Sequence, residues 1–292
     1  MDRLEGAREN AKLYGMKGAK FPVMTCGSGA EATTSGGNVT ILGVNEIHES
    51  GDIVFEAQQH WRLTGARNLS WVSAVGLPLA SSVADYYASR ASTRPGQGSQ
   101  LHMDNVCGPD EHNAAVNDSG YIIASAITTI NFAIELAEIH ARHGSVDEQE
   151  ASAYNISGWK DTVARLAPSL PYDSTRSFHP EFEGMPLNGF QAKQADTLML
   201  QYPLMFNHST MTGASRRNDL GYYSKHSLIS PDMTQAICAL HCPTSDPTHP
   251  LCLAHVVSAQ AICGQHCHSS VPTHPLCLVP RGDCTVHQRR EL

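Results

Sequence analysis

The sequence predicts an all-α fold, a toroid of helix pairs with its functional site on the loop face. A long helix expected at 119–143 is apolar on most faces and therefore belongs in an interior. Its isoleucines recur at helical spacing, at Ile123, Ile127, Ile130 and Ile134. Glycine- and aromatic-rich loops separate the expected helices, and no section is strand-rich or alternates strands with helices.

The other elements follow from local start and stop signals. Glycines end the first helix near Gly15, Asp52 is expected to cap the second, and Pro78 to bend the third. A short strand is expected at 100–103, and Gly158 interrupts a more polar helix. The full set of expected helices is 1–14, 52–64, 69–90, 119–143, 148–167, 191–201 and 214–227.

Composition excludes some functions. The chain has 292 residues, a net charge of −8 and no basic run, which argues against a nucleic-acid partner. We expect no membrane partner, because no uninterrupted apolar run reaches the roughly 18 residues needed to span a bilayer. The N-terminus lacks the apolar segment of a signal peptide. Five glycosylation-type sequons nevertheless point to a secreted or vacuolar parent, so the compartment stays open: Asn38, Asn68, Asn117, Asn155 and Asn207.

The loop before the apolar helix carries the acids of greatest interest. Gly108-Pro109 breaks regular structure, and Asp110 and Glu111 follow it directly. Two carboxyls at the mouth of a buried helix are candidates for raised pKa and for proton transfer. The alternative is structural: Asp110 caps a turn and Glu111 interacts with the helix N-terminus.

Four stretches in order identify a family that the sequence resembles. They are Tyr14-Gly-Met-Lys-Gly-Ala-Lys-Phe-Pro22, Gly108-Pro-Asp-Glu-His112 with Val116-Asn-Asp-Ser119, Phe178-His-Pro-Glu-Phe182, and Lys193-Gln-Ala-Asp196 with Tyr202-Pro203. The region around them resembles the catalytic domain of glycoside hydrolase family 65. That family includes acid-trehalase-like enzymes, disaccharide phosphorylases and protein-glucosylgalactosylhydroxylysine glucosidases.

The resemblance implies a partial (α/α)6 toroid in residues 1–235 and an inverting enzyme. Glu111 would be the general acid that protonates the glycosidic oxygen, and burial against an apolar helix would raise its pKa toward the working range. Lys193 and Gln194 would contact hydroxyls of the glucosyl group. A carbohydrate is the expected partner, and we expect no cofactor.

Further substrate-binding candidates each have a structural alternative. Asp110 and His112 flank the acid, and His112 either tunes it or fills the loop. His179 either contacts sugar or, with Glu181, hydrogen-bonds to shape its own loop. Lys193 and Asp196 could instead form an i,i+3 ion pair on a helix surface. Trp61 and Trp71 are expected to pack helices rather than to form sugar platforms.

The sequence also departs from the family that it resembles. The family's upstream Trp-Asp loop has no counterpart here, and Val23-Met-Thr-Cys26 stands where a Trp usually follows Phe-Pro. The resemblance ends near residue 235, before the helices that carry the hydrolases' expected base and before the C-terminal β-sandwich.

A cysteine- and histidine-rich repeat with a 25-residue period occupies 236–292, where seven of the nine cysteines lie. Its first unit offers three thiolates and an imidazole that could hold a tetrahedral zinc, at Cys238, Cys242, His249 and Cys252. The spacing matches no zinc module that we recognise, so disorder is the default expectation for this tail.

These observations predict hydrolysis of an α-glucosidic bond, in trehalose or a glucosyl-galactosyl unit, with inversion. Phosphorolysis is the chemical alternative, in which inorganic phosphate replaces the base. The third possibility is an inactive truncated chain that at most binds sugar.

Overall fold

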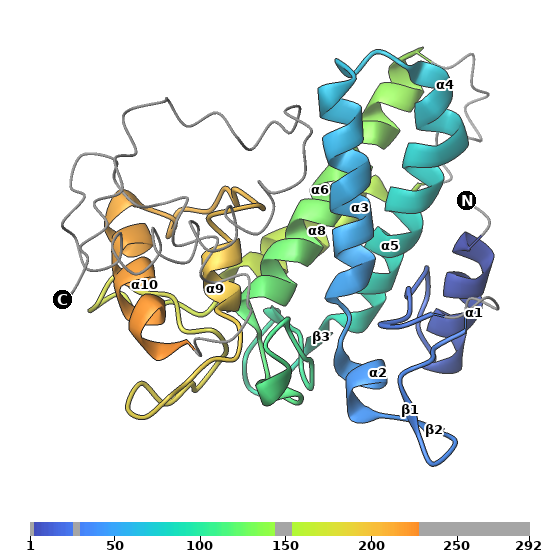
Figure 1. The fold of residues 1–292 in the computed structure, drawn as a ribbon. Coiled ribbons are helices and arrows are strands. Elements are labelled where there is room, and N and C mark those ends of the chain that lie inside the picture. Colours follow the sequence, from blue (N-terminus) through green and yellow to red (C-terminus); the bar gives the residue numbers. More distant parts are fainter. Residues whose placement is uncertain (1–2, 26–29, 144–153, 228–292) are drawn as a thin grey trace, which may run out of the picture. The chain divides into compact units, whose positions relative to one another are not determined.

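Helices make up most of the fold in the computed structural model, which describes residues 3–25, 30–143 and 154–227 (Figure 1). The α-helices are α1 (Leu4–Leu13), α2 (Ile41–Asn45), α3 (His48–Leu63), α4 (Leu69–Trp71), α5 (Leu77–Arg90), α6 (Gly120–His143), α8 (Ile156–Leu166), α9 (Asp196–Met199) and α10 (Gly213–His226). Two antiparallel ribbons pair β1 (Thr34–Ser35) with β2 (Asn38–Val39) and β3 (Ser92–Thr93) with β4 (Leu101–His102). The described part is therefore helix-rich with few strands.

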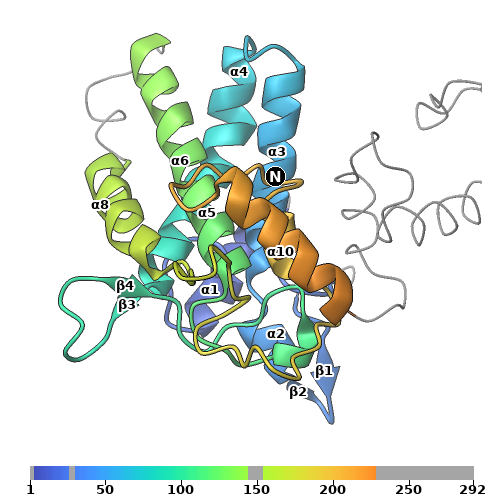
Figure 2. The same ribbon diagram turned by 90° about the vertical axis from the view of Figure 1, so that its left-hand side faces the viewer.

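Helix α6 is the centre of the core, as its sequence predicts. It packs against α3, α5 and α8, which lie around it in both views (Figures 1 and 2). Its isoleucines and alanines are buried almost throughout. The driving force is the apolar area that this helix removes from water on most of its faces.

Helix α6 is also long and apolar enough to cross a membrane. This corrects the expectation that no segment is long and apolar enough. Ser125 and Thr129 interrupt the apolar run without bringing its mean hydropathy below 1.6. Of the most apolar 18 residues of α6, 72% are buried against the rest of the fold, as is typical of a core helix.

The third expected helix is one nearly continuous rod with a changed pitch in its middle. A π-helical turn, Val72–Gly76, joins α4 to α5, and Pro78 is the second residue of α5, directly after this turn. Trp61 and Trp71 stack with ring centroids 5.7 Å apart, and Trp61 is 1% exposed. The prediction that these tryptophans pack helices is confirmed.

The predicted cap of the second helix is wrong. Helix α3 begins at His48, four residues earlier than expected, so Asp52 lies inside it. The Asp52 carboxylate instead accepts hydrogen bonds from the His48 ring and from the Tyr121 hydroxyl. Helix α8 begins at Ile156 with Asn155 as its cap, so Gly158 lies in its first turn and does not interrupt it.

The expected helix at 191–201 is also wrong in extent, since only α9 forms. The residues before it use their backbone groups in tertiary contacts: Ala192 N–H donates to the His226 carbonyl (2.8 Å) and Lys193 N–H donates to Asp110. The sequence analysis missed α2 and the β1–β2 ribbon. Helices α6 and α10 and the strand β4 are confirmed close to their expected positions.

One end of the helix layer carries the loops that matter for function. There α5 ends and α3 and α6 begin, with the segment 91–119 between them (Figure 1). Outside the described residues lie Cys26, the expected boundary at 235, and the zinc candidates of the tail, Cys238, Cys242, His249 and Cys252.

Candidate active site

The turn Gly108–Glu111 is built around the buried side chain of Asp110, which is 1% exposed. Asp110 caps a short 3-10 helix, η2 (Glu111–Asn113), by accepting from His112 N–H (3.2 Å) and from the Asn113 amide (2.8 Å). Burial raises the pKa of Asp110. The structural alternative for Asp110, the capping of a turn, is confirmed.

The segment 193–196 holds this turn in register. Lys193 N–H donates to Asp110 Oδ1 (3.2 Å), and the Gln194 amide donates to the Pro109 carbonyl (2.9 Å). The Lys193 ammonium pairs with the Glu111 carboxylate. Two segments more than eighty residues apart are thus joined at successive positions.

Glu111 and Lys193 lie at the edge of the protein rather than in its core. Each side chain is 38% exposed, so the predicted burial of Glu111 against the apolar helix is not observed. Glu111 raises the pKa of Lys193, chiefly through their hydrogen bond. The alternative ion pair between Lys193 and Asp196 is wrong, because Lys193 precedes α9 and Asp196 is 1% exposed.

Asp196 and Glu181 form a buried carboxyl pair beneath the turn. Asp196 N–H donates to Glu181 Oε1 (3.2 Å), and the two side chains are 1% and 2% exposed. Burial and the neighbouring carboxylates raise the pKa of both acids well above their ordinary values. Glu181 Oε2, Asp196 Oδ1 and the Ser119 hydroxyl are buried without a hydrogen-bond partner.

A histidine at the start of α3 lies among three further acids. His48 Nδ1 contacts Asp52 (2.7 Å), while Nε2 contacts Glu46 (3.1 Å) and Glu49 (3.5 Å). Burial lowers the pKa of His48, but its hydrogen bonds to Asp52 and Glu46 outweigh burial and hold it well above 6.5. The carboxylates around His48 therefore favour the charged form of its ring. The sequence analysis missed it, although the i,i+4 spacing of His48 and Asp52 is a visible signal.

Backbone pairing connects this histidine group to the turn. Glu46 and Cys107 form a parallel bridge, and Cys107 N–H donates to the Asn45 carbonyl (2.9 Å). The start of α3 and the turn before Glu111 are consequently neighbours.

Comparison with known proteins decides the family. The sequence model of the glycosyl hydrolase family 65 central catalytic domain matches residues 1–185. The chain belongs to this family. The matched residues include Glu111 and His179 and end before Lys193 and Gln194.

Curated relatives in family 65 carry more than one activity in their names. The chain is 32% identical over 241 residues to a protein-glucosylgalactosylhydroxylysine glucosidase of Danio rerio, covering 82% of this chain and 33% of that protein. It is 28% identical over 241 residues to a kojibiose hydrolase of Flavobacterium johnsoniae, covering 82% and 31%. The chain therefore spans about a third of the length of the curated relatives that it matches.

A solved structure supports the fold of this family 65 chain. A human-microbiome protein provisionally named a kojibiose phosphorylase superposes with a TM-score of 0.64 at 18% identity, over 81% of this chain and 35% of that one. The likeness shows a shared fold of α/α type.

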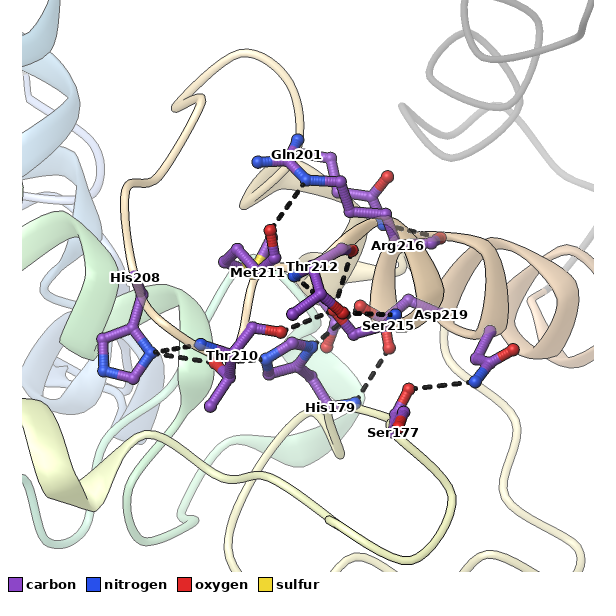
Figure 3. A network of polar contacts seen from close by, with 12 residues as sticks. Ser177, His179, Gln201, His208, Thr210, Met211, Thr212, Ser215, Arg216 and Asp219 are labelled. Atoms are coloured by element: carbon purple, nitrogen blue, oxygen red, sulfur yellow. Dashed lines mark hydrogen bonds and ion pairs between the residues drawn. The ribbon is translucent and has the colours of Figure 1, made fainter.

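His179 of the family 65 chain is fully engaged in a buried network (Figure 3). Its ring contacts Asp219 through Nδ1 (2.9 Å) and Thr210 through Nε2 (2.7 Å), and its backbone N–H donates to Asp219 (2.8 Å). His179 is 1% exposed, so neither ring nitrogen is available to a sugar. These contacts support the alternative role, the shaping of its loop. His112, by contrast, is exposed beside Glu111.

A cavity of about 390 Å³ opens elsewhere in the described fold. His102 and Asp118 lie in its wall, together with Tyr172 and Glu183, and neither Glu111 nor Lys193 lines it. His102 Nδ1 contacts Asp118 at 2.6 Å. The acid-bearing turn therefore lies outside the wall of this cavity.

Proposed function

We propose that this family 65 chain carries the acid-bearing part of a glycosidase site that cleaves an α-glucosidic bond with inversion. Glu111 is the general acid in this proposal. The supporting observation is the register between turn 108–111 and segment 193–196, which presents an exposed carboxyl next to an exposed ammonium on a fixed backbone. A departing sugar oxygen needs a proton at the moment of cleavage, and a positioned carboxyl can deliver it.

Lys193 and Gln194 supply the sugar contacts in this proposal. The Lys193 ammonium has three donor hydrogens, of which Glu111 takes one, and Gln194 keeps its amide oxygen free of the bond to Pro109. Sugar hydroxyls can use both. The carboxylate oxygens of Asp110 accept hydrogen bonds from His112, Asn113 and Lys193, so in this proposal Asp110 fixes the turn and does not contact sugar. His112 is exposed and can reach a substrate.

The substrate class follows from the relatives' names. Those names specify glucosylgalactosyl-hydroxylysine and kojibiose, so we place an α-linked glucosyl residue on the acid's side of the bond. In hydrolysis, water attacks the anomeric carbon from the opposite face as the bond to the leaving oxygen breaks. The proton that water loses passes to a second carboxylate, the base, to which this proposal assigns none of the described residues. Trehalose remains a further α-glucosidic candidate from the sequence analysis.

Phosphorolysis is the second candidate. Curated relatives include a kojibiose phosphorylase of Escherichia coli, 26% identical over 264 residues. In this reaction phosphate attacks in place of water, and the same acid protonates the same leaving oxygen. Hydrolysis releases glucose, whereas phosphorolysis releases glucose 1-phosphate and requires inorganic phosphate.

Turnover of a synthetic α-glucoside and of kojibiose, with and without phosphate, tests this proposal. Glu111→Gln should lower kcat by roughly 10²–10⁴-fold, since it removes the general acid. Glu183→Gln is the matched control, because Glu183 is an ion-paired, 48% exposed acid in a neighbouring loop. Equal turnover by Glu111→Gln and by the unchanged chain would reject the assignment of Glu111. No turnover by the unchanged chain would favour a chain that at most binds sugar.

A further inference from the structure

We propose that Glu181 and Asp196 share one proton and act together as the positioning element for the turn that carries Glu111. This inference deepens the proposed function, on which the role of Glu111 rests. Both acids are buried, and neither touches the sugar in the proposed site.

The environment of Glu181 and Asp196 favours a proton shared between them. Both side chains are almost completely buried, and they are joined by the bond from Asp196 N–H to Glu181 Oε1. Among the described residues, neither carboxyl forms an ion pair with a Lys, Arg or His. Two adjacent carboxylates in a dry interior repel each other strongly, and a proton held between them removes the repulsion and supplies a hydrogen bond.

Asp196 of the pair contacts the turn at Gly108. A Cβ added to Gly108 would lie far inside van der Waals contact of Asp196 Oδ2 and 3.1 Å from the Ser119 hydroxyl. The Asp196 carboxyl therefore lies directly against the Gly108 backbone. Glu181 anchors the pair to the core, because its carbonyl accepts from Gly120 N–H at the start of α6 (2.8 Å).

Contacts continue without a gap from Asp196 to Glu111. Asp196 lies against Gly108, Gln194 bonds Pro109, and Lys193 bonds Asp110 and Glu111. The Glu181–Asp196 pair thus fixes the buried end of segment 193–196, and Lys193 at the other end of this segment pairs with Glu111. Displacement of Asp196 would move Lys193 and Glu111 together.

The charged and titratable groups that face the pair come from every neighbouring element. The Asp110 carboxylate opposes ionisation of both acids, whereas a hydrogen bond from the Asp110 backbone N–H and the charge of His48 on α3 favour ionisation of Asp196. The remaining neighbours are neutral near pH 7: Cys107, Tyr121 on α6, and Tyr222 and Tyr223 on α10. Loss of the shared proton would leave two adjacent charges beside Asp110, which pushes the turn outward.

Asp196→Asn is the informative variant. An Asn–Glu pair carries one negative charge and one hydrogen bond at every pH, so it reproduces the singly protonated pair permanently. Asp196→Ala removes both the hydrogen bond and the contact with Gly108. Asp85→Asn is the matched control, since Asp85 is a partly buried acid on α5 that accepts from Trp159 Nε1 (2.9 Å) away from the turn.

Amide hydrogen exchange of the peptide covering 104–116 in the full chain measures the turn without requiring turnover. Between about pH 6 and about pH 9, and after correction for intrinsic rates, exchange in wild type should accelerate about tenfold or more, the equivalent of one pKa unit. Asp196→Asn should remain slow throughout, Asp196→Ala should be fast throughout, and Asp85→Asn should match wild type.

The same pH response in Asp196→Asn as in wild type would overturn the inference, as would a turn that exchanges slowly in Asp196→Ala. Glu181→Gln makes the same replacement from the other acid, so the pair is tested even if one variant fails to fold. Because exchange does not depend on catalysis, a normal exchange result with no effect of Glu111→Gln on turnover would reject the proposed function alone.

Discussion

The Asp196 carboxyl lies against the backbone of Gly108, in the space that any side chain at position 108 would occupy. Gly108 does not have a positive φ, so the close approach, and not backbone conformation, requires glycine here. This single contact links the buried acids to the turn that ends in Glu111.

Gly108→Ala should therefore destabilise the fold. The added methyl overlaps the Asp196 carboxyl, and overpacking of this kind costs about 1–3 kcal/mol. Gly221→Ala is the matched control, because nothing lies within 4 Å of the corresponding Cβ in α10. It should stabilise by about 0.5–1 kcal/mol through helix propensity. Urea unfolding measures both, and equal free energies of unfolding would contradict the contact.

Lys193→Gln should separate function from stability. Its ion pair with Glu111 is 38% exposed on each side, so the free energy of unfolding should change by less than about 1 kcal/mol. Turnover of an α-glucoside should fall by roughly tenfold or more, because a charged contact to sugar is lost. Lys160→Gln removes the exposed pair with Glu138 and should change neither quantity. Unaltered turnover in Lys193→Gln would remove this residue from the site.

Glu49 should make stability depend on pH. Burial raises the pKa of Glu49 from 4.5 to about 7. The folded protein therefore holds a proton that the unfolded chain has released, and this contribution to stability is lost as pH rises from 4.5 to about 7. Glu49→Gln should flatten the unfolding free energy over this range, whereas the exposed Glu56→Gln on the same helix should not. An unchanged slope in Glu49→Gln would contradict the assignment.

Asp219→Asn should loosen the loop of residues 177–182. Asp219 is fully buried and accepts from both the backbone and the ring of His179, so an amide in its place loses one charge-assisted acceptor. We expect a loss of roughly 1–3 kcal/mol in unfolding free energy. The KM for sugar should stay constant, since His179 faces the core. A raised KM with intact stability would instead place His179 in the sugar site.

The sequence predicted the elements whose patterns are dense and local. Helix α6 follows from its isoleucine spacing, and α10 and β4 also appear close to their expected positions. The failures arose where tertiary contacts outweighed local signals. Asp52 looks like a cap, but the His48 ring and the Tyr121 hydroxyl draw it into the interior of α3.

In the candidate site, too, local motifs were predictable and long-range contacts were not. The motif that carries Glu111 was visible, and the structure brings Lys193 and Gln194 to it across more than eighty residues. Burial of Glu111 was predicted from its position before an apolar helix, yet the bridge between Val106 and Val116 turns that loop back before α6 begins. The pairing of Glu181 with Asp196 depends on that long-range register, which no local pattern encodes.

Thermal unfolding of the full chain, followed by circular dichroism with and without excess glucose, tests the central claim most directly. We expect a cooperative transition whose midpoint temperature is raised by glucose in wild type and not in Lys193→Gln, because the sugar binds only where segment 108–111 pairs with segment 193–196. A gradual transition that glucose leaves unmoved would contradict a formed sugar site on this chain.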